Sequence, residues 1–514
     1  MRLISSLLLI TAISFFLHGE EPEDPPLSLS VWEAIESTLL YQWNVEISRE
    51  EVRLQAGVLQ QTAGPFDPVL DTIYEHQYLD DLQILGFKSS KKGNRNVLDL
   101  AASKLTRYGT FAQVGMEIDQ VHNPLFIPGR RNEAAVFFTI DQPLLRNFLF
   151  SQEYANELSA SYDLRAVKAQ FIFAMSQEVR DVVQQYWQTL SAKELLKIRQ
   201  DSVERLQDLT DSVERLIEGG QLAETEINQQ LAQLYDEKRR VSASVQTLFD
   251  SYNNLRLNMG LPKIPYCLEP PSLELEDFPK ISDVEKPCSI ECMLEVASQN
   301  RGDYLASLWN IESSSAQTQA ARNAMLPRLD VNMGVTMRNQ EIGSRAKSFF
   351  RPLDTSQPQR DWTIGATLSV PLWNDDAKGS FRSRRAFQQQ ALLSSEQLYE
   401  IIRTDIANAV RNHYALIEEI RNAEETVKWY RKAFEDETRR MKEGYSTLFI
   451  VLDFEVNLNN ALTNRLGAYF NYASNLVELY FLTGQLVQED SCNRRVYIAD
   501  VQTVDPILKE YGRG

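Results

Sequence analysis

The hydrophobic pattern of this chain occurs twice. One helical run lies between Gly220 and Gly260 and a second between Gly444 and Gly484, and the two glycines of each pair are equally far apart in the sequence. Within each run apolar residues recur at steps of three and four, which is typical of a coiled-coil seam. A shared spacing of this kind indicates internal duplication, in which each copy contributes one structural unit.

The seam positions of the two runs correspond when Gly220 is aligned with Gly444. In the first run they are Ile227, Leu231, Leu234, Lys238, Val241, Val245, Leu248, Tyr252 and Leu255. In the second they are Val451, Glu455, Leu458, Leu462, Arg465, Tyr469, Tyr472, Leu476 and Leu479. Each run therefore predicts a helix that returns from a tight tip and packs along an antiparallel partner.

The partner helix of the first repeat is predicted to be very long. No proline or glycine interrupts the chain from Ser151 to Glu218, and at 1.5 Å per residue such a helix reaches roughly 100 Å. The return helix covers only about half of it. Shorter helices, predicted over Leu29–Gln61 and Ser289–Ala324, would stack end to end on the two return helices and cover the remainder.

Alternating segments predict strands upstream of each long helix. Val331, Met333, Val335 and Met337 alternate with polar or small residues, and the segment from Trp362 to Val370 alternates in the same way. This pattern fits a β-barrel with lipid outside and water inside, and it fits equally a hairpin on a soluble core. In lipid the strand edges need partners, so the membrane interpretation requires an oligomer.

The first repeat carries an insertion. The interval from Pro68 to Pro143 is much longer than the corresponding interval from Pro327 to Pro371. The final strand remains visible near Val136–Asp141, and a further alternating segment runs from Ala112 to Ile118. That segment forms an external hairpin, or it displaces the strand expected at Phe66–His76.

Composition restricts the setting in which the chain works. Residues 1–19 have the charged start and short apolar core of a secretory signal, and no later stretch of about 18 apolar residues predicts a spanning helix. A net charge of −18 argues against a nucleic-acid partner. We expect no enzyme activity, no metal and no cofactor, because phosphate-loop, nucleophile-elbow and zinc-site motifs are absent from the sequence.

The four cysteines, in an exported chain, permit two disulfides in any of three connectivities. They are Cys267, Cys288, Cys292 and Cys492. The first two bracket the proline-rich link between the repeats, and disulfides would staple that link.

Several short motifs, in their order and duplication, resemble the TolC-like outer-membrane efflux protein family. They are Ala321 to Leu329, Leu368 to Trp373, Glu443-Gly444, Leu452-Asp453, Leu479 to Gly484 and Gln142 to Arg146. The resemblance implies a homotrimer in which each protomer gives four strands to a 12-stranded barrel in outer-membrane lipid. The helices would form a periplasmic α-helical barrel, and a periplasmic adaptor (membrane fusion protein) and an inner-membrane transporter would be its partners.

The resemblance also assigns roles to residues at the two tips. Gly220 and Gly444 correspond to the turn that meets the adaptor. The family tends to have acidic residues six and nine positions later, at the periplasmic aperture; here Glu226 and Asp453 keep the charge, whereas Gln229 and Ile450 stand at the other two positions. Three copies of Asp453 around an axis would favour cations. Alternatively, Glu226 and Asp453 are solvated charges near helix starts, where the helix dipole favours them.

The sequence thus predicts a mainly α protein with a transmembrane β portion, built from a duplicated strand-hairpin and long-helix repeat. We expect it to be the outer-membrane exit duct of a tripartite efflux or type I secretion system, with most of its mass in the periplasm. The alternative is a periplasmic structural coiled-coil protein without a pore. The expected segments are a signal peptide (1–19), the first repeat (20–262), a linker (263–288), the second repeat (289–486) and a C-terminal segment (487–514).

Overall fold

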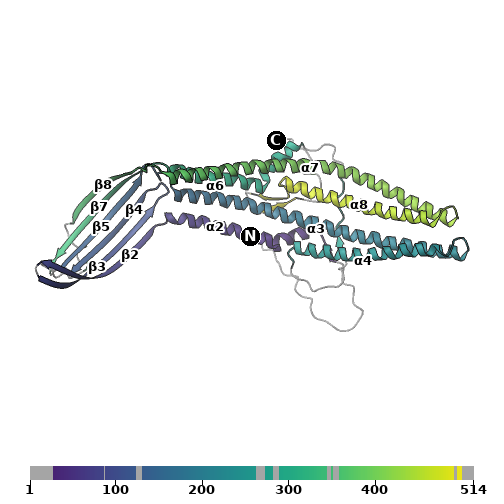
Figure 1. The fold of residues 1–514 in the computed structure, drawn as a ribbon, viewed down its shortest axis with the longest axis horizontal. Helices are drawn as coiled ribbons and strands as arrows, with labels where there is room; N and C mark the ends of the chain where they lie inside the picture. Colours follow the sequence, from purple (N-terminus) through teal and green to yellow (C-terminus); the bar gives the residue numbers. More distant parts are fainter. Residues whose placement is uncertain are drawn as a thin grey trace, which may run out of the picture.

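The protein is an elongated rod with a β-sheet at one end and a layer of long helices forming the rest (Figure 1). The computed structural model describes residues 27–85, 87–122, 130–261, 273–281, 289–343, 349–350, 353, 358–490 and 495–499, without the side chains of 79–92, 489–490 and 495–497. The predicted signal peptide and most of the predicted linker lie outside these residues.

Two helical hairpins form the part of the rod far from the sheet. Helix α3 (Gln152–Glu218, 67 residues) turns back into α4 (Glu226–Asn258), and α7 (Asp375–Lys442, 68 residues) turns back into α8 (Leu448–Leu482). At 1.5 Å per residue, α3 and α7 are each about 100 Å long. The long helix and tight tip predicted from the sequence are confirmed, and the second repeat has the same arrangement.

The shorter helices continue the lines of the return helices toward the sheet. Helix α2 (Trp43–Ala63) follows α4 along one side of α3, and α6 (Gly302–Ala324) follows α8 along the other (Figure 1). The prediction of one unbroken helix per short segment is wrong. Helix α1 (Val31–Tyr41) ends before Gln42, and α5 (Ile290–Asn300) ends before Arg301, both of which have extended backbone.

The two breaks have a common physical cause, which is the close approach of the return helices. Gly260 ends α4 with φ +68°, and a Cβ built on it would lie 2.3 Å from the Tyr41 carbonyl oxygen. Gly484 follows the end of α8 with φ +69°, and its Cβ would lie 2.7 Å from the Arg301 nitrogen. Each return helix therefore ends against the break in its short helix, so the duplication extends to this contact.

A buried core near the middle of the rod joins the repeats. Strand β1 (Leu27–Leu29) pairs in parallel with β6 (Leu273–Leu275), which belongs to the predicted linker. The Tyr186 hydroxyl of α3 donates to the Leu29 carbonyl and accepts from the Glu276 backbone nitrogen, both at 2.7 Å. The described part of the linker, residues 273–281, is thus held against α3. Strands β9 (Val487–Asp490) and β10 (Arg495–Ile498) form a hairpin after α8.

The sheet at the end of the rod has six antiparallel strands in the order β2-β3-β4-β5-β7-β8. The first repeat provides β2 (Val69–Leu85), β3 (Phe87–Leu105), β4 (Phe111–His122) and β5 (Arg130–Pro143). The second provides β7 (Arg328–Ile342) and β8 (Gln359–Ser369). A short 3-10 helix, η1 (Gly64–Phe66), connects α2 to β2.

The six strands correct two expectations. The insertion in the first repeat forms neither an external hairpin nor a replacement strand, because β2 is retained and both additional strands pair within the sheet. The single chain also has six strands in this sheet where the family resemblance implies four. Strand β3 has polar residues on both of its faces, so the alternation of apolar and polar positions did not predict it. Its backbone hydrogen-bonding groups are satisfied by pairing with β2 and β4.

Candidate functional site

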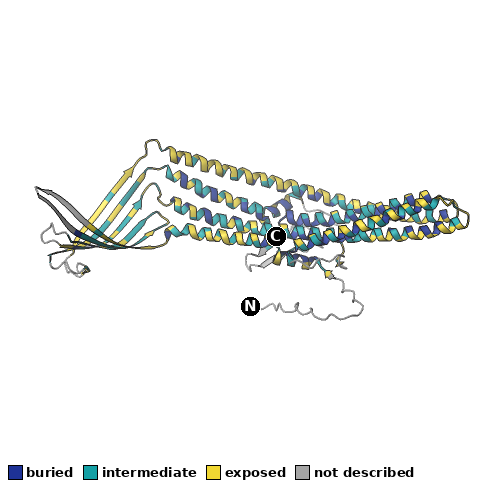
Figure 2. Ribbon diagram, turned by 60° about the horizontal axis from the view of Figure 1, so that its bottom comes forward, coloured by how far each residue is buried: buried dark blue, intermediate teal, exposed yellow. Residues whose placement is uncertain are grey.

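One face of the sheet is apolar across all six strands. The row Leu70, Ala102, Val114, Phe138, Val335 and Trp362 joins residues that lie directly opposite one another from β2 to β8. Because opposite residues of antiparallel strands point to the same side, this row lies on a single face. Most of its large side chains are exposed, Trp362 to 76%. Figure 2 shows the exposed residues along these strands.

The apolar face has the height of a lipid bilayer core. On β7 the apolar positions run from Leu329 to Met337, which is about 30 Å of strand at 3.4 Å per residue and roughly 23 Å of height at a tilt near 40°. Beyond this height, a polar row crosses the same face from His76 through Asn96 and Gln120 to Asn132. The face is therefore an apolar band with a polar border.

Exposed apolar and aromatic side chains mark the other border, where strands give way to helices. Tyr108 in the β3–β4 turn, and Leu372 and Trp373 after β8, are all exposed. Rings at such a boundary are typical of the aromatic girdle of membrane strands, since their apolar body and polar edge suit the lipid headgroups.

The opposite face of the sheet is polar and predominantly acidic. The Arg95 guanidinium donates to both carboxylate oxygens of Asp119, at 2.9 and 3.1 Å, which links β3 to β4. Arg338 pairs with Glu133 at 3.1 Å and links β7 to β5. The other acidic residues on this face are Asp71, Glu75, Asp99, Glu117, Asp141, Asp330 and Asp361. Such a face requires water and favours cations beside it.

Both predicted tip glycines lie at the turns of the helical hairpins. Gly220 has φ +71° and Gly444 φ +80°, and a Cβ on either would meet no atom within 4 Å. In each turn the glycine nitrogen bonds a carbonyl three residues back, Ile217 or Met441, which closes the end of the helix. Beside Gly444, Tyr445 is 82% exposed and Phe449 65% exposed. The second tip thus presents apolar side chains to solvent.

The two predicted aperture residues differ in their surroundings. Asp453 lies on the exposed side of α8 near its start and accepts a hydrogen bond from the Asn457 side chain at 3.1 Å. Glu226 is the first residue of α4 and is half-buried. The other two positions, Gln229 and Ile450, are exposed. Their role at an aperture remains a prediction.

A buried charged cluster near the tips was missed by the sequence analysis. The Glu455 carboxylate is completely buried and accepts from the Ser202 hydroxyl at 2.9 Å and from the Arg205 guanidinium at 3.1 Å. Asn459 donates to Glu455 at 2.8 Å, and its amide oxygen accepts from Arg205, also at 2.8 Å. Burial raises the pKa of Glu455 above its usual value, while Arg205 opposes this shift. The sequence offered one signal for this cluster, because Glu455 is a charged residue at a coiled-coil seam position, where apolar residues are expected.

The cluster joins the two hairpins, because Arg205 belongs to α3 and Glu455 to α8. A second buried pair lies close by on α3, where Arg199 bonds Glu237 of α4 at 3.1 Å. Charges buried with a partner are stable only while the partner stays in place. These contacts therefore hold α4, α3 and α8 in one arrangement below the tips.

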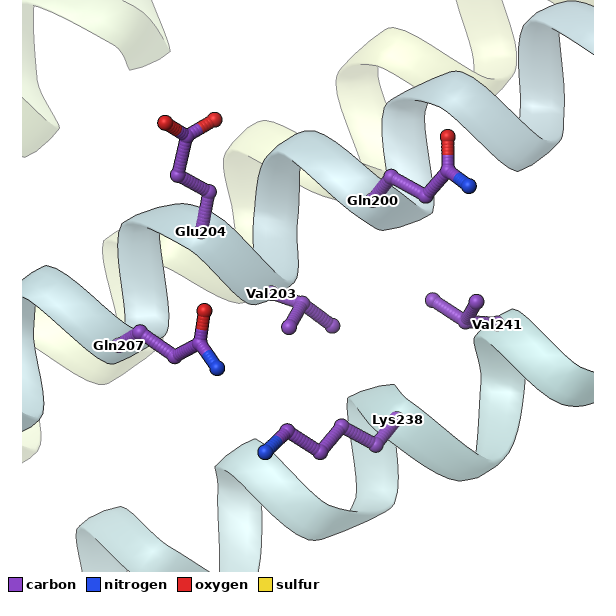
Figure 3. A pocket seen from close by; sticks show the side chains of 6 residues that line it. All are labelled: Gln200, Val203, Glu204, Gln207, Lys238 and Val241. Carbon is purple, nitrogen blue, oxygen red and sulfur yellow. The ribbon is translucent and has the colours of Figure 1, made fainter. Parts of the chain in front are cut away.

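A shallow groove of about 290 Å³ runs between α3 and α4 near the same height. Figure 3 shows Gln200, Val203, Glu204 and Gln207 of α3 on one side, with Lys238 and Val241 of α4 on the other. Val203 and Val241 face one another across the groove, Glu204 points away from it, and the amine end of Lys238 lies on the side of Gln207. The groove is open and has the mixed character of a coiled-coil surface, not that of an enclosed ligand site.

The structure also bears on the metal, cysteine and spanning-helix predictions, for the residues that it describes. Within the described residues, no cluster of His, Cys, Asp and Glu is arranged to hold a metal ion. Cys292 is half-buried and has no disulfide partner among the residues that the structure describes; Cys267, Cys288 and Cys492 lie outside those residues, so the disulfides remain predictions. None of the described helices has the length and apolarity of a membrane span.

Comparisons of this sequence with a family model and with curated proteins agree with one another. Residues 293–485 match the family model described as outer membrane efflux protein. The pyoverdine export outer membrane protein OpmQ of Pseudomonas putida is 27% identical over 329 residues, 61% of this chain and 63% of OpmQ. The chain thus spans just under two thirds of that relative. The outer membrane protein TolC of Vibrio cholerae is 23% identical over 66% of this chain and 76% of its own length.

Solved structures share the fold. The outer-membrane channel OprN superposes with a TM-score of 0.67 and 17% identity, covering 88% of this chain and 90% of that one. CusC superposes with a TM-score of 0.65 and 15% identity, covering 91% and 95%. These relatives are channel proteins, not enzymes. Residues 293–485 thus match the outer membrane efflux protein family, and the two relatives and the shared fold make the chain similar to TolC-like channels, which lie in the outer membrane with a large periplasmic portion.

Proposed function

We propose that this protein is the exit duct of a tripartite efflux or type I secretion system and that it works as a homotrimer. Its substrates would cross the periplasm and the outer membrane passively, with a periplasmic adaptor and an inner-membrane transporter supplying energy and selection. The observation that carries the proposal is the sheet with one apolar and one acidic face, continuous with helices about 100 Å long.

The sheet cannot remain open in lipid. Among the described strands, β2 and β8 are the two edges and present unpaired backbone groups. Such groups are very unfavourable in hydrocarbon, so spanning sheets close into barrels. Copies of this chain, joined edge to edge, satisfy both edges. The apolar face then meets lipid and the acidic face lines water.

The helical layer has two lateral edges of the same kind. On one side, Trp43 and Ile47 of α2 are exposed, and on the other side Phe387 and Leu393 of α7 are exposed. These helices lie at opposite sides of the layer in Figure 1. A neighbouring copy on each side would bury these apolar side chains, which favours the same oligomer for the helices as for the sheet.

The tips are the surface proposed for the adaptor. At Gly220 and Gly444 a Cβ would meet no atom within 4 Å, and Tyr445 and Phe449 offer apolar contacts beside Gly444. Exposed apolar groups of this type mark interaction sites. Asp453 is proposed to face the axis, where three carboxylates would bind cations and narrow the entrance electrostatically.

The alternative, a periplasmic structural coiled coil without a pore, accounts for the helices alone. It gives no reason for Trp362, Ile364 and Leu368 to lie exposed on one face of β8. Extraction distinguishes the two, because a structural protein washes off membranes in carbonate whereas a barrel requires detergent.

Single-channel conductance in a planar bilayer tests the duct directly. The detergent-purified protein, with its oligomer mass measured first, is expected to give cation-selective steps. Asp453→Asn should lower cation selectivity, while the control Glu435→Gln, which removes an exposed carboxylate from α7, should leave it unchanged. A trimer that conducts identically in all three forms excludes Asp453 from the aperture. A soluble species that never inserts refutes the duct.

A further inference from the structure

The first repeat supplies four strands to the sheet where the resemblance implies two, and the β2–β3 hairpin lies at the edge at which one copy would meet the next. Strands β2 and β3 form a hairpin, and β3 pairs with β4 along all 12 residues from Phe111 to His122. The outer edge of β4 is therefore filled within the chain. The free edges belong to β2 and β8.

The β2–β3 hairpin has the same two faces as the rest of the sheet. On its apolar face, Leu98 lies opposite Tyr74 on β2 and Ile118 on β4, and Leu100 lies opposite Met116. On its polar face, Asp99 lies opposite Glu117, and the two-pronged Arg95–Asp119 pair fastens β3 to β4. A hairpin lying in lipid outside a barrel would expose these charges to hydrocarbon, which is strongly unfavourable.

The polar border of the apolar band continues across β2 and β3. His76 of β2, Asn96 of β3 and Gln120 of β4 lie in one row, joined by side-chain contacts of 2.6 Å between His76 and Asn96 and 3.3 Å between Asn96 and Gln120. The row continues to Asn132 of β5. Strands β2, β3, β4 and β5 thus reach the polar border of the apolar band at the same height, as spanning strands must.

The dimensions of the two layers agree with six strands. Four helices, α2, α3, α6 and α7, lie side by side next to the sheet (Figure 1), and at about 10 Å each they are roughly 40 Å wide. Six strands at 4.8 Å, tilted by about 40°, occupy roughly 38 Å of barrel circumference, whereas four occupy about 25 Å. Six strands therefore match the width of the helices that follow them.

We infer that each protomer contributes six strands to the barrel, so that three copies close an 18-stranded barrel in which β8 of one protomer pairs with β2 of the next. This inference rests on the proposed trimer. Adding two strands keeps the number even, so the new seam remains antiparallel. Because barrel diameter grows roughly in proportion to strand number, the membrane lumen would be about 1.5 times as wide as with 12 strands. The barrel within the membrane would therefore admit a substrate that is too bulky for a 12-stranded barrel.

Cryo-electron microscopy of the detergent-purified oligomer counts the strands per protomer. Six strands per protomer in one closed barrel is the expected result, and four, with the hairpin outside, overturns the inference. The mass of the oligomer is read from the same sample. If the assembly is not a trimer, the proposed trimer is refuted, but the map still shows how many strands each protomer contributes to the barrel.

Disulfide cross-linking in the membrane tests the seam itself, in a full-length chain whose native cysteines are serines. Thr363→Cys on β8 is combined with one cysteine on the same face of β2, at Asp71, Ile73 or Glu75. The matched controls place the second cysteine on β4, at Gln113, Gly115 or Glu117. Cross-linked oligomers are expected from the β2 set alone. Cross-links from the β4 set, or from neither set in a sample that is trimeric by mass, contradict the seam.

Discussion

Two glycines with the same backbone conformation are expected to respond very differently to substitution by alanine. Gly444 at the tip and Gly484 after α8 have φ of +80° and +69°. In this left-handed region a Cβ is unfavourable by roughly 1–2 kcal/mol, whatever its surroundings. Only Gly484 has close neighbours, because its Cβ would lie 2.7–2.9 Å from backbone atoms of Asn300 and Arg301.

The difference between the two variants follows from these contacts. Backbone atoms at the break between α5 and α6 cannot swing aside as a flexible side chain does, and overpacking of this kind typically destabilises by about 1–3 kcal/mol. Gly444→Ala should therefore lower the free energy of unfolding by about 1–2 kcal/mol and Gly484→Ala by about 2–5 kcal/mol. The entropic effect on the unfolded chain is the same for both and cancels in the comparison.

The assay is urea unfolding of the detergent-purified protein, followed by loss of helical circular dichroism. The first repeat supplies an independent matched pair, since Gly220 has open surroundings whereas a Cβ on Gly260 would lie 2.3 Å from the Tyr41 carbonyl oxygen. Gly260→Ala should resemble Gly484→Ala, and Gly220→Ala should resemble Gly444→Ala. If the two variants of a pair, Gly444→Ala with Gly484→Ala or Gly220→Ala with Gly260→Ala, lose the same free energy of unfolding, the close contact between the return helices and the breaks is refuted.

Three further predictions concern buried titratable groups in the helices. Burial lowers the pKa of His413 from 6.5 to about 4, so the folded state binds fewer protons than the unfolded state over this range. Stability should therefore fall by about 3 kcal/mol as the pH drops from 6.5 to about 4. In melting experiments at pH 7.5 and pH 4, the variant His413→Leu should lack this loss of stability. Burial raises the pKa of Glu455, so its contribution should have the opposite sign, with stability falling as the pH rises from the usual carboxyl pKa to the raised one; Glu455→Gln should show a flatter profile over that interval, and an unchanged profile would count against the assignment. Arg205→Ala leaves Glu455 buried without its cation and should destabilise by about 3–5 kcal/mol, more than Arg239→Ala, whose partner Asp236 is half exposed; urea midpoints compare the two.

The sequence alone was sufficient for the duplicated architecture, because its signals are local. A glycine at a left-handed position and an apolar residue every three or four positions each depend on a few neighbours, and both recur in the second repeat with the spacing of the first. Gly220, Gly444 and the long helices therefore lie where the pattern indicates. The strand from Arg328 follows the same principle, since alternation reports which side of a strand is apolar.

Only the tertiary structure decided which segments meet. The breaks before Gln42 and Arg301 arise where the return helices end, a contact between residues that are far apart in the sequence. Glu455 is stable in the core because Arg205 and Ser202, which belong to the other repeat, reach it. Strand β3 has no clear alternation of its own along much of its length, and its hydrogen bonds to β2 and β4 place it in the sheet. A pattern along the chain reports the faces of an element, whereas the identity of its neighbour depends on packing between distant segments.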